Sequence, residues 1–279
     1  MKEHQTLGYH PGKTRIHNLN PTAKLIFLLV VSIACMTTYD TRFLLFVSLF
    51  SVGLFPLAHI KWHQVSFVIK FIALFSLLNL VTVYLFEPEY GVKLYGTRHL
   101  IFEGIGRFTL TQEQVFYLVN LVLKYFCTIP LALVFLLTTN PSSFASSLNK
   151  IGVSYKISYA VSLALRYIPD IQEEFFTISQ AQQARGFEMS KKGKFLQRVK
   201  GTAQIVVPLI FSSLDRIESI STAMELRRFG QKKTRTWYVG QPFKVKDSVL
   251  VVGALLLLLI TLWLFQVNGG RFYNPFNKK

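Results

Sequence analysis

Three carboxylates lie close together at Asp170, Glu173 and Glu174, and neighbouring carboxylates are a common source of general acid–base catalysis. No histidine or nucleophilic-serine motif accompanies them, so the other half of a catalytic pair is missing from the pattern. Acidic residues near the start of a helix are also stabilised by the helix dipole. The sequence therefore favours a solvated helix face here over an acid–base site.

Metal binding is a second chemistry that the residue types allow. His59 and His63 are four residues apart, and on a helix both rings would face the same metal ion. They stand beside Lys61 and Trp62, which is typical of a loop at a membrane interface. Three more histidines lie in a polar leader without neighbouring cysteines: His4, His10 and His17. We expect no metal site, no catalytic residue and no bound cofactor.

A segment near the amino terminus resembles a phosphate-binding loop. Residues 8–14 read Gly-Tyr-His-Pro-Gly-Lys-Thr, one residue shorter than the pattern G-x-x-x-x-G-K-[ST]. The true motif also needs a strand before the loop, and no strand-forming run precedes this one. We therefore expect this chain to bind no nucleotide.

The strongest signal is a pair of arginine tripeptides, Ala184-Arg185-Gly186 and Leu226-Arg227-Arg228, whose first arginines are 42 residues apart. An arginine at a helix tip offers a planar fork of donors to the carboxylates or backbone carbonyls of a partner. Arginine and glycine are also common at helix carboxyl ends for local reasons, so one copy alone would mean little. Two copies, each closing an amphipathic run, indicate docking to a protein partner.

The first arginine follows a helical stripe of apolar residues at Ile171, Phe175 and Ile178. Gly186 is suited to end that helix in the left-handed conformation. Before it, we expect a short helix at the membrane interface over 155–165 and a break in the chain at Pro169.

The second arginine closes a helix with two distinct faces. We expect Gly230 to end this helix and Pro208 to allow a bend before it. One face is apolar, at Ile210, Leu214, Ile217 and Met224. The other is polar, at Asp215, Glu218, Thr222 and Glu225.

The positive charge is concentrated around these two helices. The chain carries a formal net charge of +17, and residues 140–246 hold 17 Lys and Arg against seven Asp and Glu. In a membrane protein such an excess marks the cytoplasmic side and attracts anionic lipid headgroups. Because hydrophobic segments flank the stretch, we expect membrane lipids and a protein partner, and no nucleic acid.

Apolar residues make up 51% of the chain, and their long runs approach or exceed the length of a membrane-spanning helix. Backbone groups in lipid must be satisfied within the segment, which favours helices. We predict an all-α polytopic membrane protein with about five transmembrane helices and a cytoplasmic domain of long amphipathic helices. Lys124, inside a span, needs a partner. The predicted spans are about 23–38, 43–58, 65–86, 114–139 and 247–267.

These spans divide the chain into three parts. Residues 1–139 form a leader and the first spans, residues 140–246 form the cytoplasmic coupling domain, and residues 247–279 form the final span and tail. The polar insert over 87–113 has a near-neutral charge that fits the outer face. With five spans and the amino end inside, the tail lies outside, whereas an undetected sixth crossing would return it to the inside.

The motifs resemble those of a known family. Residues 180–186 (Gln-Ala-Gln-Gln-Ala-Arg-Gly) and 223–228 (Ala-Met-Glu-Leu-Arg-Arg) are similar to the two signature motifs of the transmembrane (T) component of energy-coupling factor transporters, the cobalt-transport Q-type family. These transporters are ABC-type importers of vitamins and transition-metal ions. Residues 9–13, 19–25 and 165–169 are similar to other parts of the family pattern.

The resemblance implies a non-catalytic coupling subunit in the bacterial cell membrane, with its amino terminus and coupling domain in the cytoplasm. Two cytoplasmic ABC ATPase subunits would hydrolyse ATP, and a small membrane S component would bind the substrate. The second motif has Leu226 and Arg228 where the family usually has alanine and glycine. This departure implies either that the second tip packs less closely on its partner or that the two sites bind two non-identical ATPases. The implied ATPase-contacting residues are Ala184, Arg185, Gly186, Leu226, Arg227 and Arg228.

A membrane-embedded lipid-modifying enzyme with a basic interfacial site is the alternative. Its basic residues would hold phosphate groups, and it would need an acid–base or nucleophilic group near the interface. No such constellation is present in the sequence. The transported compound, a vitamin or a transition-metal ion such as cobalt or nickel, is not encoded in this chain, because its pocket would belong to the S component.

Overall fold

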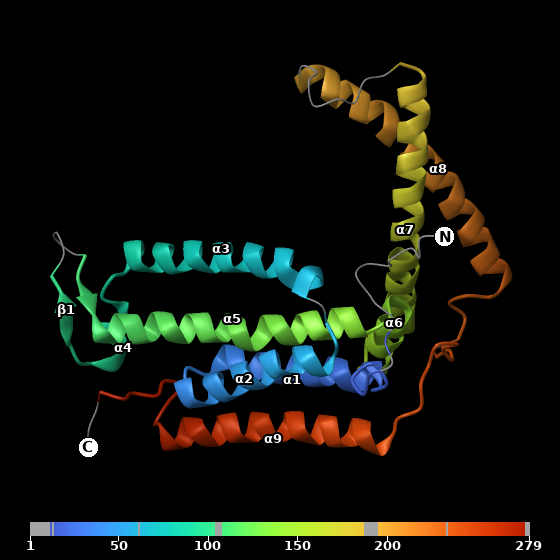
Figure 1. The fold of residues 1–279 in the computed structure, drawn as a ribbon. Helices are drawn as coiled ribbons and strands as arrows, with labels where there is room; N and C mark the ends of the chain where they lie inside the picture. Colours follow the sequence, from blue (N-terminus) through green and yellow to red (C-terminus); the bar gives the residue numbers. More distant parts are fainter. Residues whose placement is uncertain are drawn as a thin grey trace. The chain divides into compact units, whose positions relative to one another are not determined.

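A computed structural model describes Gly12 and residues 14–60, 62–103, 108–186, 195–232 and 234–276. Nearly all of the regular structure in these residues is helical (Figure 1). The chain divides into two compact units. Pro141–Gly240 forms the first, here called the basic unit. The described residues up to Asn140 and from Gln241 onward form the second, here called the membrane unit.

The membrane unit is built on apolar helices that run side by side (Figure 1). Three are long and apolar enough to cross a membrane: α3 (Trp62–Phe86), α5 (Gln112–Thr138) and α9 (Val245–Val267). Two shorter apolar helices, α1 (Pro21–Thr37) and α2 (Thr41–Leu57), have 17 residues each. These helices coincide with the predicted hydrophobic runs, so the all-α polytopic membrane class is confirmed.

The core of the membrane unit lies where α1, α2, α5 and α9 meet. Its buried side chains are Phe27, Val31, Ala34, Cys35, Phe43, Leu44, Val47, Cys127, Leu131 and Ala254. Many apolar side chains outside this core are exposed, and the most apolar 18-residue stretch of α3 contains no buried residue. Lipid chains solvate such a surface as well as a protein core would, so the exposed surface is what a membrane protein requires.

Lys124 finds its partner in a neighbouring span. Its ammonium donates to the carbonyl of Met36 at 2.9 Å and lies 3.2 Å from the ring centroid of Tyr39. Both partners lie at the end of α1 or directly after it. The lysine thus joins α5 to α1.

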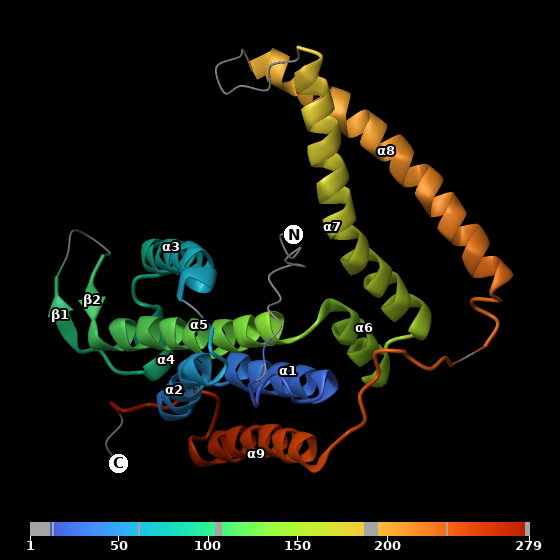
Figure 2. The same cartoon turned by 45° about the vertical axis from the view of Figure 1, so that its right-hand side comes forward.

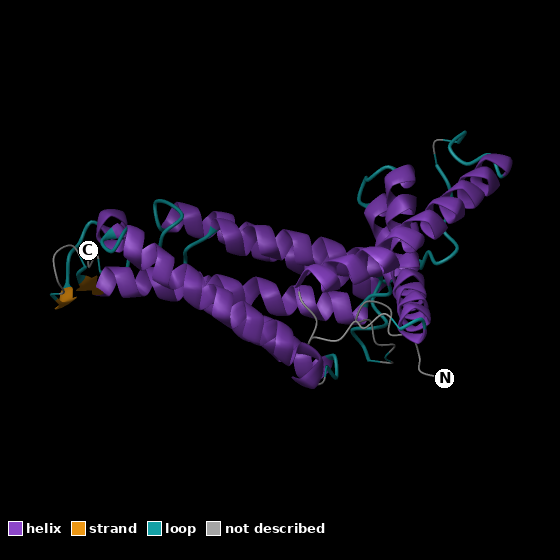
Figure 3. Ribbon diagram, turned by 90° about the horizontal axis from the view of Figure 1, so that it is seen from above, coloured by secondary structure: helices purple, strands orange, loops and turns teal. Residues whose placement is uncertain are grey.

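The insert between α3 and α5 folds into a small cap at one end of the membrane unit. It contains α4 (Tyr90–Tyr95) and a hairpin of β1 (Leu100–Phe102) and β2 (Leu110–Thr111), the orange strands of Figure 3. The fully buried carboxylate of Glu113 holds the cap. It accepts hydrogen bonds from the His99 backbone at 3.1 Å and from Thr97 Oγ1 at 3.0 Å.

The segment after α9 packs across the same end of the unit. The Tyr39 amide donates to the carbonyl of Arg271 at 2.8 Å, and Asn268 Nδ2 donates to Asp40 Oδ2 at 2.8 Å. Asn274 Nδ2 donates to the carbonyl of Tyr95 at 2.9 Å. This tail therefore lies at the same end as the α1–α2 turn and the cap, as an odd number of spans requires.

The basic unit consists of α6 (Pro141–Lys150) and two long helices, α7 (Tyr155–Ala184) and α8 (Phe195–Leu226). Figure 2 shows α8 crossing α7 near the end of α7 and diverging from it toward the start of α7. The predicted break at Pro169 is wrong, because α7 runs through it as one helix of 30 residues. The predicted short helix over 155–165 is therefore only the first part of α7. Helix α8 likewise runs through Pro208.

Candidate functional site

The first arginine tripeptide forms the tip of α7. Arg185 is the last residue bonded into the helix, and its amide donates to the carbonyls of Ala181 at 3.3 Å and Gln182 at 3.1 Å. Gly186 follows at φ +85°, the left-handed conformation predicted for it. Ala184, Arg185 and Gly186 are all exposed, so the guanidinium projects from a small, accessible tip.

The second tripeptide ends α8 with the same backbone geometry. The Phe229 amide donates to the carbonyl of Met224 at 2.9 Å, and the Arg228 amide donates to that of Glu225 at 2.8 Å. These two bonds define a Schellman motif, which places Arg228 at the left-handed position with φ +52°. Arg228 thus stands where Gly186 stands in the first tip. The predicted terminator, Gly230, lies two residues too late.

The left-handed backbone makes Arg228 a strained residue, since a side chain in this region costs roughly 1 kcal/mol more than glycine. We expect Arg228→Gly to raise the stability of the second tip by about 1 kcal/mol, seen as an increase in the protection of the Met224–Phe229 amides from hydrogen exchange. Arg227→Gly is the matched control and should not raise protection, because Arg227 precedes the left-handed position. Equal gains from both variants would contradict this interpretation.

Residues that follow the second tip support it. The Arg235 guanidinium donates to the carbonyls of Arg227 at 3.0 Å and Arg228 at 3.1 Å, which satisfies the end of α8. The Phe229 ring packs on Tyr155 and Tyr159 at the start of α7, with centroid distances of 5.5 Å and 4.8 Å. Sequence reasoning missed both Arg235 and Phe229. An apolar residue directly after a left-handed cap is a signal for the contact of Phe229.

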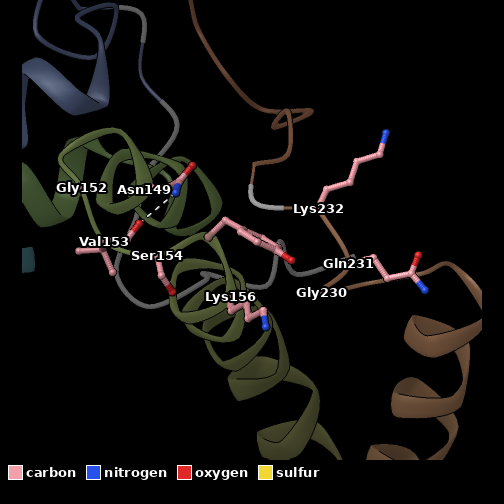
Figure 4. Close-up of a pocket in the computed structure, with 9 residues that line it drawn as sticks. Asn149, Gly152, Val153, Ser154, Lys156, Gly230, Gln231 and Lys232 are labelled. Carbon is pink, nitrogen blue, oxygen red and sulfur yellow. Dashed lines mark hydrogen bonds between the residues drawn. The ribbon is translucent and has the colours of Figure 1, made fainter.

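A cavity of ≈ 410 Å³ lies beside the second tip (Figure 4). It separates the α6–α7 turn from the segment that follows α8, and Trp237 Nε1 bridges the two by donating to Asn149 Oδ1 at 3.1 Å. Ser154 caps α7 by accepting from the Ile157 amide at 3.4 Å. The lining residues are Asn149, Gly152, Val153, Ser154, Tyr155, Lys156, Gly230, Gln231 and Lys232.

The crossing of α7 and α8 is fixed by Glu174, one of the three clustered carboxylates. Its Oε2 accepts from Arg216 Nη2 at 2.8 Å, and the Ser212 hydroxyl donates to its other oxygen. Asp170 and Glu173 are exposed, as expected for a solvated helix face, but Glu174 is partly buried in the helix–helix contact. The most sheltered of these carboxylates is therefore a structural ion-pair partner.

The apolar face of α8 is not buried within the unit. Ile210, Leu214 and Ile217 are 52%, 53% and 61% exposed. Phe176 of α7 and Phe211 of α8 are exposed as well. Gathered apolar side chains on the surface of a polar, charged unit mark a contact for protein or membrane. The predicted stripe exists, and it faces outward.

The other candidates do not converge. Within the described ranges, no three His, Cys, Asp or Glu residues approach one another closely enough to hold a metal ion. His17 lies 2.6 Å from the Thr14 hydroxyl through Nδ1, and His59 ends α2 with a left-handed backbone. His4, His10 and most of the loop over 8–14 lie outside the described residues, as does the side chain of His63.

Comparison with known proteins identifies the chain. The family model of CbiQ, described as cobalt transport protein, matches residues 12–238 and so includes both arginine tips. The chain belongs to this family. The resemblance to the transmembrane component of energy-coupling factor transporters is thereby confirmed.

Relatives of this chain carry the name energy-coupling factor transporter transmembrane protein EcfT, and three of them cover nearly its whole length. The protein from Lactococcus lactis is 26% identical over 91% of this chain and 96% of its own length. The Bacillus subtilis protein is 27% identical over 95% and 99%, and the Bacillus selenitireducens protein is 28% identical over 94% and 97%. The family model and these relatives each cover most of this CbiQ-family protein.

Proposed function

We propose that this protein couples ATP hydrolysis by two cytoplasmic ABC ATPase subunits to a small membrane-embedded S component, which takes up a vitamin or a transition-metal ion. The observation that carries the proposal is the pair of exposed helix tips. Both present an arginine at the helix cap, followed by a left-handed residue, and both belong to one unit. Two equivalent tips fit two ATPase subunits.

Each tip is built to enter a groove on a partner. A helix carboxyl end carries a partial negative charge, and the arginine there offsets it while its donors extend beyond the last turn. The first tip is flanked by small residues, Ala184 and Gly186, and can approach a partner closely. At the second tip Leu226 is 80% exposed and Arg228 adds a second cation. We infer that the two tips bind two ATPases that are not identical.

The outward apolar face of α8 suits a membrane partner. An S component is itself apolar and would cover Ile210, Leu214 and Ile217, whereas an ATPase would contact the charged tips. Because Glu174 and Arg216 hold α7 and α8 at their crossing, a displacement imposed at the tips would reach this apolar face. The contact thus connects the ATPases to the substrate-binding subunit.

We further propose that residues 140–246 form the coupling domain on the cytoplasmic side of a bacterial cell membrane, together with the amino terminus. The excess of ten positive charges in this stretch supports that orientation and a contact with anionic lipid headgroups. A lipid-modifying enzyme would need an acid–base group in the same place. Glu174, the partly buried carboxylate there, is already paired with Arg216.

The proposal is tested by purifying the protein with its natural partners after photo-crosslinking. A crosslinker at Ile217 should capture a small apolar membrane protein, and two ATPase subunits should copurify with the complex. The matched control is a crosslinker at Asp215, two residues away and also exposed, which should not capture it. Purification without any ATPase subunit, or equal capture at both positions, would overturn the proposal.

A further inference from the structure

A group of buried polar contacts lies where the chain leaves and re-enters the membrane unit. Helix α5 ends at Thr138, shortly before the basic unit begins at Pro141, and the chain returns from that unit at Gln241. The start of α1, the start of α9 and the end of α5 meet at one end of the membrane unit (Figure 1). The two connections to the basic unit therefore attach at the same end.

Asn20 binds the returning connection. It is buried, and its Nδ2 donates to the carbonyls of Gln241 at 3.1 Å and Pro242 at 3.3 Å. Its backbone amide donates to Asp247 Oδ1 at 2.7 Å, while its Oδ1 accepts from Thr22 to cap α1. One side chain thus begins α1 and holds the first two residues after the basic unit.

Lys24, one turn further along α1, binds the departing connection. Its ammonium is buried and donates to the carbonyl oxygen of Thr138 at 3.1 Å and to the Thr138 hydroxyl at 3.3 Å. The nearby carboxylate of Asp247 attracts the same charge. A buried ammonium is costly unless it is hydrogen-bonded and compensated, so a lysine at this position fixes a particular arrangement.

Asp247 joins the two halves of this group. Its Oδ1 accepts from the Asn20 amide, and its Oδ2 accepts from the Lys244 amide at 2.8 Å at the start of α9. The carboxylate is almost fully buried. A hydrogen-bonded network of this kind specifies one geometry, because breaking any member leaves the others unsatisfied.

We propose that Asn20, Lys24 and Asp247 form a polar clasp that holds the end of α5, the start of α1 and the start of α9 in one geometry, so that the two connections leave and re-enter the membrane unit at fixed points. The role in transport rests on the proposed coupling function. The apolar core already holds α1 against α5 and α9 further along the helices, so packing alone does not require polar groups at this end. The clasp positions the two connections.

The test uses the full chain with two spin labels on the membrane unit, at exposed Leu136 near the end of α5 and exposed Val249 near the start of α9. Lys24→Met and, separately, Asn20→Ala should each broaden the distance distribution between the labels by about a factor of two, because the end of α5 and the start of α9 lose their fixed geometry. The native thiols, Cys35 and Cys127, are fully buried and stay unlabelled. Lys24→Arg keeps the donors and should restore the narrow distribution.

Lys124→Met is the matched control, since it also removes a buried, hydrogen-bonded lysine from a span but at the opposite end of the unit. It should leave the width unchanged even if it lowers the melting temperature. An unchanged width in Lys24→Met and Asn20→Ala would overturn the clasp. The proposed function is tested separately, by copurification of ATPase subunits with the native sequence. Purification without any ATPase subunit would contradict coupling and leave the width comparison intact.

Discussion

Replacing Arg185 and Arg227 together by glutamate is expected to abolish assembly with the ATPase subunits, and ATP-driven uptake with it. Each substitution removes a donor fork from a helix tip and places a like charge next to the negative end of the helix and the partner's carboxylates. Losing one charged anchor in an interface costs about 2–4 kcal/mol, so two losses lower the affinity by a factor of roughly 1,000 or more. Copurification and uptake in intact cells measure the two effects.

Arg166→Glu is the matched control for this prediction, because Arg166 is an exposed arginine of α7 away from the tip. It should leave assembly and uptake close to those of the native protein. The single variants carry further information. If the tips bind two different ATPases, Arg185→Glu and Arg227→Glu each release a different subunit. Intact assembly and intact uptake in the double variant would show that these tips do not dock an ATPase.

Glu174→Arg is expected to uncouple the two long helices without removing the tips. The new cation faces Arg216, so an ion pair with 2.8 Å between Nη2 and Oε2 becomes a like-charge contact. The pair is partly exposed, so its loss is worth about 1 kcal/mol of stability and the helix should still form. Uptake should fall by about tenfold for each assembled complex, because the angle of the crossing is no longer fixed.

The charge swap Glu174→Arg with Arg216→Glu restores the ion pair in reverse. It should recover most of the uptake, and the ATPase subunits should copurify with both the single and the double variant. Uptake normalised to the amount of assembled complex separates this effect from a loss of folding. Failure of the swap to recover uptake would mean that Glu174 acts through another contact, such as that with Ser212.

The membrane helices and the two arginine tips could be predicted because each depends on local patterns. A long apolar run must be a helix in lipid, and hydropathy alone locates it. An arginine closing an amphipathic run is visible in the sequence, as is Gly186 after it. The repetition of this pattern at Arg227 carried the family resemblance. None of these inferences required knowledge of contacts between distant residues.

Interruptions and caps were harder to predict, because tertiary contacts decide them. Pro169 and Pro208 each remove one backbone hydrogen bond from their helix. The helices continue through both positions, because the helical turns before and after each proline keep their hydrogen bonds. Helix α8 ends at Leu226, with Arg228 in the left-handed position despite its side chain, while glycine preference favoured Gly230. The packing of Phe229 on Tyr155 and Tyr159 accounts for the earlier end.

The cap over 87–113 and the clasp were invisible for a related reason. Glu113 looked like one charge of a polar insert, although it is buried beneath His99 and Thr97. Asn20 and Lys24 could be recognised in the sequence only as part of the family resemblance, because nothing there indicated their physical role. Their partners, at 138, 241 and 247, are more than 100 residues away in the sequence, and no periodicity connects them.

Helix α3 has a consequence for how the protein responds to its surroundings. Its most apolar 18-residue stretch contains no buried residue, and its main neighbour is α5. Tilt in such a helix is governed by the thickness of the bilayer more than by side-chain packing. Bilayers of short-chain or long-chain lipids should therefore reorient α3 before they disturb α1, α2, α5 and α9, whose shared core resists tilting.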